Sequence, residues 1–168
     1  VEIIPGKLTR IIGVNGVTPG PTIHARSGRR AVVRFQNGLP ATTLGNSPGD
    51  LTIHLHGGHT PAVDDGYPID PTFVRGGVRA YDYPNNQPAT TLWYHDHIKE
   101  ESAPNVWYGL AGFYLLTDDL EASLGLPSGA YDVPLAVQDR GFDANGQIVY
   151  TENVNGETGD TLLVNGAI

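Results

Sequence analysis

The sequence predicts an all-β fold, a Greek-key β-sandwich followed by the first strands of an incomplete second sandwich. The 22 Gly and 13 Pro of the 168 residues are spread as turn signals between short β-branched and aromatic runs, which is typical of sandwiches and barrels. Helical periodicity is almost absent. The spacing of the runs fits a Greek-key connection.

Six runs before residue 118 are candidate strands, and turn pairs such as Asn15-Gly16 and Asn37-Gly38 separate them. These runs are Leu8–Val14, Ala31–Gln36, Leu51–His56, Arg79–Tyr83, Thr90–His97 and Gly109–Thr117. They form the expected first domain, residues 1–128.

The pattern changes after Asp118. Leu120–Leu126 is expected to form a short helix or turn, and residues 127–129 (Pro-Ser-Gly) a linker. Strands resume at Tyr131–Gln138 and Gly146–Tyr150, and the Asn145-Gly146 pair suggests a hairpin. A strand followed by Val-Asn-Gly occurs at Val14 and again at Val164. This repeat favours a second sandwich that begins in residues 129–168.

Composition limits the function. The net charge of −8 argues against a nucleic-acid partner or an anionic membrane surface. No apolar run approaches the roughly 18 residues of a membrane helix. The chain has no Cys, which excludes a disulfide framework and a thiolate-bound blue copper within these residues. It has no Met and no targeting segment either, so we expect a mature or trimmed piece of something longer.

Two His-x-His pairs are the strongest chemical signal, His54 with His56 and His95 with His97. Side chains two apart on a strand share a face, with α-carbons about 6.6–7 Å apart, so each pair suits two metal ions side by side. Four imidazoles on neighbouring strands would present nitrogen ligands to zinc, copper, iron or nickel. The aliphatic face of the first His strand looks core-directed, so the His faces are expected to point outward or into a cleft between sandwiches.

A single tetrahedral zinc site fits this spacing poorly. If each pair straddles two ions, four imidazoles leave the site half-built, and the missing ligands must come from another domain or chain. His24, isolated on a strand, and His59, in a turn past two glycines, are not expected to be ligands.

Several segments resemble the first cupredoxin domain of the multicopper oxidases, in the bacterial branch of spore-coat laccases and bilirubin-oxidase-like enzymes. They are residues 15–23 (NGVTPGPTI), 51–61 (LTIHLHGGHTP), 92–97 (LWYHDH) and 108–114 (YGLAGFY), and residues 131–140 resemble the start of domain two. The likeness covers nearly the whole chain.

The resemblance implies a cupredoxin-like fold and an oxidase with copper as its cofactor. Such an enzyme oxidises small aromatic compounds or metal ions at a blue copper and reduces O2 to water at a trinuclear cluster. His54 would bind the type 2 copper, His56 and His95 one type 3 copper, and His97 the other. The other ligands would come from the remaining domains, so this chain alone is expected to be inactive. Family members are commonly exported or placed in spore coats.

The resemblance also assigns Asp65, in Asp-Asp-Gly-Tyr-Pro, to proton delivery near the type 2 copper, and an ordinary turn carboxylate is the alternative. Asp96 alternates away from its flanking histidines and is expected to brace the strand by hydrogen bonding. Trp93 shares the His face and is a candidate wall of the site, although an aromatic in such a position more often serves simple packing. Two other functions stay open: a scaffold domain that has lost copper chemistry, and a stand-alone zinc or copper domain.

Overall fold

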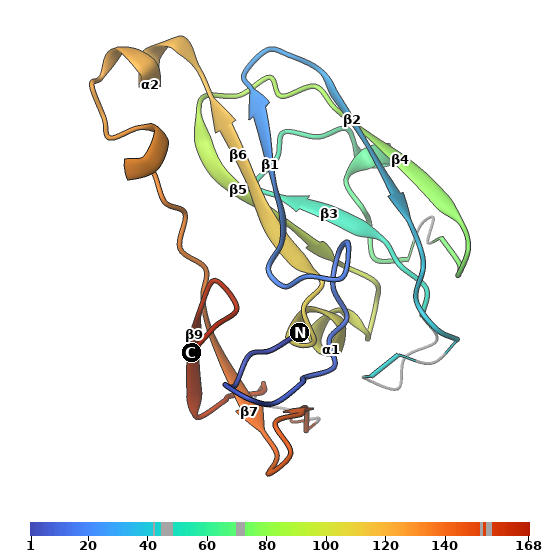
Figure 1. The fold of residues 1–168 in the computed structure, drawn as a ribbon. Helices are drawn as coiled ribbons and strands as arrows, with labels where there is room; N and C mark the ends of the chain where they lie inside the picture. Colours follow the sequence, from blue (N-terminus) through green and yellow to red (C-terminus); the bar gives the residue numbers. More distant parts are fainter. Residues whose placement is uncertain (42, 45–48, 70–72, 152, 154–155) are drawn as a thin grey trace.

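The computed structural model describes residues 1–41, 43–44, 49–69, 73–151, 153 and 156–168 (Figure 1). Its strands are β1 Gly20–Arg26, β2 Ala31–Gln36, β3 Ile53–His56, β4 Val78–Tyr83, β5 Thr90–Asp96, β6 Ala111–Thr117, β7 Val137–Phe142, β8 Ile148–Val149 and β9 Thr161–Val164. Its helices are short: η1 Ala62–Asp64, α1 Ser102–Trp107, α2 Asp119–Ser123 and η2 Gly129–Tyr131. The predicted all-β class is confirmed.

The first domain is a sandwich of two sheets. One sheet has the order β1-β6-β5-β3, with β1 parallel to β6 and β5 antiparallel to both of its neighbours. The other pairs β2 with β4 in antiparallel register. Buried aromatic residues fill the space between the sheets, including Tyr81, Tyr83 and Tyr114, each at most 1% exposed. This core fixes the orientation of β3 and β5.

The predicted alternation of the two His strands is confirmed. Ile53 and Leu55 are at most 2% exposed, and Leu51 just before the strand is 5% exposed, so the aliphatic face of β3 lies in the core. In the β3–β5 register His54 lies opposite His95. The histidine side chains therefore project from the opposite face of this sheet, away from β2 and β4.

The predicted strand at Leu8–Val14 is wrong. Only isolated bridges occur there, from Leu8 to Glu2 and from Val14 to Val17. The backbone of this segment bonds instead to distant groups: Ile12 N–H donates to the carbonyl of Tyr108 at 2.9 Å, and the side chain of Gln147 bonds to Arg10 N–H and Leu8 C=O. His24 does lie on a strand, and that strand is β1.

The helices and strands after residue 118 match the sequence predictions in part. The helix α2 forms where a short helix or turn was predicted, and Asp118 caps it by accepting from Glu121 N–H at 2.8 Å. The hairpin around Asn145-Gly146 joins β7 and β8. The strand predicted at Tyr131–Gln138 is displaced, because residues 129–131 form η2 and β7 begins at Val137. In the described residues no helix is long and apolar enough to cross a membrane.

Candidate metal centre

Four imidazole rings gather on one patch of the β3–β5 face. The ring centroids of His54 and His97 lie 4.8 Å apart. His95 lies 5.5 Å from both His54 and His97 and 5.6 Å from His56. The predicted convergence of the two His-x-His pairs is therefore present.

Backbone carbonyls hold three of these rings by the Nδ1 atom. His54 Nδ1 lies 2.6 Å from Asp65 O, His95 Nδ1 lies 2.7 Å from Asp96 O, and His97 Nδ1 lies 3.2 Å from Gly66 O. A carbonyl only accepts, so we assign a proton to each of these Nδ1 atoms. In a neutral imidazole protonated at Nδ1 the lone pair is on Nε2, the arrangement that orients metal-binding histidines in proteins.

His56 is oriented differently. Its Nδ1 faces Nε2 of His95 at 3.3 Å. The donor nitrogens of His54, His56 and His95 all lie within 4.8 Å of one another. Two imidazoles on one tetrahedral ion lie about 3.3 Å apart when each metal–nitrogen bond is about 2.0–2.1 Å. The separation of His56 and His95 thus fits two ligands of one ion.

The loop that holds His54 and His97 depends on a glycine. Gly66 has φ +70°, in the left-handed region, and a Cβ there would overlap the carbonyl oxygen of Ile53 on β3. Glycine therefore allows residues 65–66 to approach β3 closely enough for their carbonyls to reach the two rings.

Trp93 forms one wall of the patch. Its ring stacks on His95 with centroids 4.1 Å apart and on His56 at 5.0 Å, with interplanar angles of 28° and 24°. Trp93 also lies directly opposite His56 in the strand register. The indole therefore limits the rotation of the His56 and His95 rings, whose nearest nitrogens lie 3.3 Å apart.

Burial keeps His95 neutral. It is 7% exposed, and the loss of solvation lowers its pKa to about 4, with the hydrogen bond to Asp96 O opposing this shift. Neutral imidazole is the form that binds metal. The site therefore presents His95 ready for coordination at neutral pH.

Asp96 braces the end of β5, as predicted. It is fully buried and accepts from Thr52 N–H at 3.2 Å and from the Asn105 amide at 3.0 Å. Burial raises its pKa to about 6, and the hydrogen bonds from Asn105 and Thr52 oppose this shift. Because Asn105 lies on α1, Asp96 joins this helix to both His strands. Sequence patterns did not indicate Asn105 or α1 as parts of the site.

Three other residues considered in the sequence are Asp65, His59 and His24. The Asp65 side chain is 39% exposed, and its Oδ1 is 3.4 Å from His54 Nδ1, so its own carbonyl is the nearer contact. His59 is exposed and donates its backbone N–H to Gln87 Oε1 at 2.6 Å. His24 is exposed on β1. Neither His24 nor His59 belongs to the ring cluster.

Comparisons with known proteins point to one family. A multicopper oxidase family model matches residues 1–121. A laccase from Bacillus stratosphericus is 38% identical, over 95% of this chain and 38% of the laccase. A bilirubin oxidase from Albifimbria verrucaria is 40% identical, over 93% of this chain and 26% of the oxidase.

Solved structures that resemble this fold belong to the same family. The crystal structure of a multi-copper oxidase from Pediococcus acidilactici superimposes with a TM-score of 0.88 at 34% identity, covering 100% of this chain and 34% of that one. The chain thus spans about a quarter to two-fifths of the length of these relatives. With the family model, the relatives and the fold in agreement, the chain belongs to the multicopper oxidase family.

Proposed function

We propose that these residues are the N-terminal part of a laccase-type multicopper oxidase, which supplies half of the histidine ligands of a trinuclear copper cluster. That cluster reduces O2 to water while a small aromatic or metal-ion reductant is oxidised at a blue copper in another part of the enzyme. The observation that supports this most is the convergence of four rings, three of them held at Nδ1 by backbone carbonyls.

Copper is the metal that family membership implies, and the donors fit it, since imidazole is a good copper ligand. Bound copper would supply one-electron chemistry, taking electrons from the reductant and giving them to O2. His54 is assigned to the type 2 ion, His56 and His95 to one type 3 ion, and His97 to the other. The 3.3 Å between His56 Nδ1 and His95 Nε2 supports the shared ion.

The proposed division places the first cupredoxin-like domain at residues 1–128 and the start of the second at 129–168. In the second part, β7, β8 and β9 form a three-stranded sheet. Val137, Leu162 and Val164 on this sheet are 64%, 68% and 47% exposed. Such apolar surface needs a covering partner, which disfavours the stand-alone metal-binding domain. An extracellular, periplasmic or spore-coat location is proposed from the family resemblance alone.

Asp65 is proposed to deliver protons to the site where O2 is reduced. Its carboxylate lies 3.4 Å from His54 Nδ1 and is partly exposed, so it can exchange protons with solvent. We expect Asp65→Asn in the full-length oxidase to lower kcat by about 10²-fold and to leave the copper content unchanged. The Asp65 carbonyl that holds His54 is retained in this variant.

Asp64→Asn is the matched control, because Asp64 lies in η1 one residue before Asp65. We expect its kcat to stay close to that of the parent enzyme. Equal losses in the two variants, or a loss of copper with Asp65→Asn, would show that the carboxylate has no part in proton transfer.

The proposed function is tested on the full-length oxidase by copper analysis and by O2 uptake with a phenolic dye. We expect bound copper and consumption of one O2 for every four electrons taken from the dye. A protein that binds no copper and consumes no O2 would instead be a scaffold domain. All four predicted histidines are present in one cluster, which disfavours a scaffold domain that has lost copper chemistry.

A further inference from the structure

The short helix α1 connects the metal centre to the β7–β8 hairpin. On one side of it, the amide of Asn105 donates to Asp96 Oδ2 at 3.0 Å, and the carbonyl of Asp96 holds His95 Nδ1 at 2.7 Å. On the other side, the indole N–H of Trp107 donates to the carbonyl of Val149 on β8 at 2.8 Å. Figure 1 shows α1 between the end of β5 and β7. The histidines and the hairpin therefore share contacts with one helix.

Arg140 on β7 contacts the last turn of this helix. Its Cζ lies 4.8 Å from the centroid of the Trp107 ring, over the ring face, and its Nη2 donates to the carbonyl of Val106 at 3.4 Å. Its Nη1 donates to the carbonyl of Asp139 at 2.6 Å. The last carbonyls of a helix and the face of an indole ring both attract a cation. The guanidinium therefore binds α1 to β7.

The burial of Arg140 makes these contacts important. Its side chain belongs to a residue that is 6% exposed, and burial lowers its pKa, with the charge of Asp139 opposing this shift. Among the described residues it forms no ion pair with a carboxylate. A buried charge that loses its partners is costly. A shift of α1 away from the hairpin is therefore unfavourable, because it would remove the contacts of the guanidinium with the helix.

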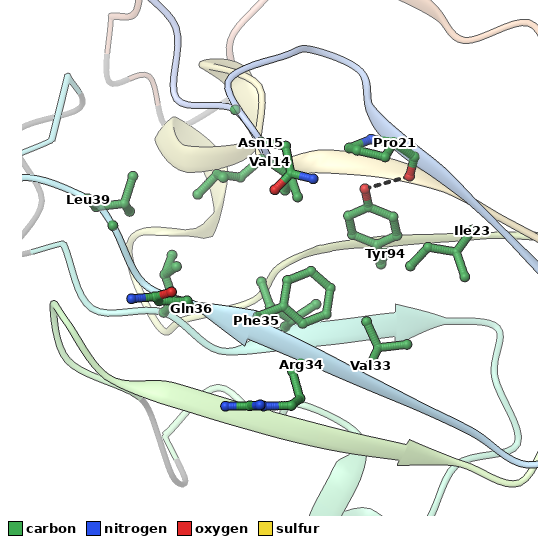
Figure 2. Close-up of a pocket in the computed structure, with 15 residues that line it drawn as sticks. Val14, Asn15, Pro21, Ile23, Val33, Arg34, Phe35, Gln36, Leu39 and Tyr94 are labelled. Atoms are coloured by element: carbon green, nitrogen blue, oxygen red, sulfur yellow. Dashed lines mark hydrogen bonds between the residues drawn. The ribbon is translucent and has the colours of Figure 1, made fainter.

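The middle and the end of β5 are held by different partners. Figure 2 shows the hydroxyl of Tyr94, in the middle of the strand, bonded to the carbonyl of Pro21 at 2.8 Å beside the cavity between the sheets. At the end of the strand, the Asp96 carboxylate accepts from Thr52 N–H and from Asn105 on α1. The position of α1 therefore bears on the end of β5, where a histidine stands on each side of Asp96.

We propose that Arg140 is a positioning residue for the metal centre. It holds α1 against the β7–β8 hairpin, and α1 holds the end of β5 so that His95 and His97 keep the spacing in which they bind metal. The inference rests on the proposed function in taking these two histidines as copper ligands. A displacement of about 1 Å can lower a reaction rate by about 10²-fold. Residues after 129 thus control a site whose histidines all precede residue 98.

Residue-resolved amide hydrogen exchange on the copper-free full-length oxidase tests this path of contacts. The amides of Asp96 and Asn105 are both hydrogen-bonded. We expect Arg140→Met to speed their exchange by about 10-fold or more and to leave the Tyr94 amide unchanged. Leu163→Ala is the matched control, because Leu163 is 2% exposed on β9 of the same sheet and its loss leaves a cavity there.

The control should lower the unfolding temperature and leave the Asp96 and Asn105 amides unchanged. Equal acceleration in the two variants, or none with Arg140→Met, would overturn the proposal. Arg140→Lys keeps the charge but not the planar fork of donors. We expect a smaller acceleration in this variant, which takes the place of Arg140→Met if the latter does not fold.

Steady-state kinetics of the copper-loaded oxidase separates positioning from folding. In the proposed function the dye and O2 react at different coppers, so kcat/KM for each substrate reports on its own site. We expect Arg140→Lys to lower kcat/KM for O2 by about 10-fold and to leave kcat/KM for the dye close to the parent value. Equal losses for both substrates would mean a smaller folded fraction and would overturn the positioning role. An oxidase without O2 uptake, in which Arg140→Met still speeds exchange at Asp96, would overturn the proposed function alone.

Discussion

At the residue scale, the site depends on which nitrogen of each ring is left free. The sequence predicts the cluster because a strand repeats every two residues, so His-x-His places both rings on one face. It does not predict the Nδ1 partners, because the carbonyls of Asp65 and Gly66 reach His54 and His97 only through tertiary folding of a loop against β3. The glycine after Asp65 is the local signal of that approach.

We therefore expect Gly66→Ala in the full-length oxidase to lower both the free energy of unfolding and the copper content. Its Cβ would overlap Ile53 O, whereas the Cβ of the control Gly76→Ala meets nothing within 4 Å at a similar φ of +80°. The difference in unfolding free energy should be about 2 kcal/mol or more, measured by denaturant titration beside copper analysis. Equal losses of unfolding free energy in the two variants would show that the close approach of this loop to β3 does not determine the site.

At the element scale, alternation and turn residues predicted most strands, and contacts between distant segments decided the rest. Leu8–Val14 has the composition of a strand, but its backbone groups bond to Tyr108 and Gln147 instead of to a neighbouring strand. The six-residue helix α1 is too short to show helical periodicity. It is joined to β5 by the Asn105–Asp96 hydrogen bond, which no local pattern indicates.

This contact predicts different outcomes for two substitutions of Asp96. Asp96→Ala leaves Thr52 N–H and the Asn105 amide without an acceptor and should cost about 2–3 kcal/mol of unfolding free energy. Asp96→Asn should cost less than about 1 kcal/mol, since Asn105 can turn its amide and accept through an Oδ1 that has no partner among the described residues. A variant Asp96→Asn that keeps its stability and copper content but loses activity would show that Asp96 takes part in the reaction. Its role would then not be structural alone.

At the scale of the whole molecule, the sheet of β7–β9 is an exposed apolar surface, on which Leu162 and Val164 are exposed. Figure 1 shows β7 and β9 at the opposite end of the molecule from the β1–β2 connection. The Val-Asn-Gly repeat predicted a second sandwich in this part of the sequence. It did not predict which apolar side chains are left uncovered, because that depends on contacts between distant segments.

The central claim is that four histidines of this chain hold copper in the assembled oxidase. The most direct measurement is the copper content and O2 consumption of full-length variants with His54, His56, His95 or His97 changed to Ala, beside the controls His24→Ala and His59→Ala. Thermal unfolding confirms that each variant is folded. We expect each of the four to lose copper and at least about 100-fold in activity, and the controls to keep both. Full copper and unchanged O2 consumption in the four variants would contradict the claim.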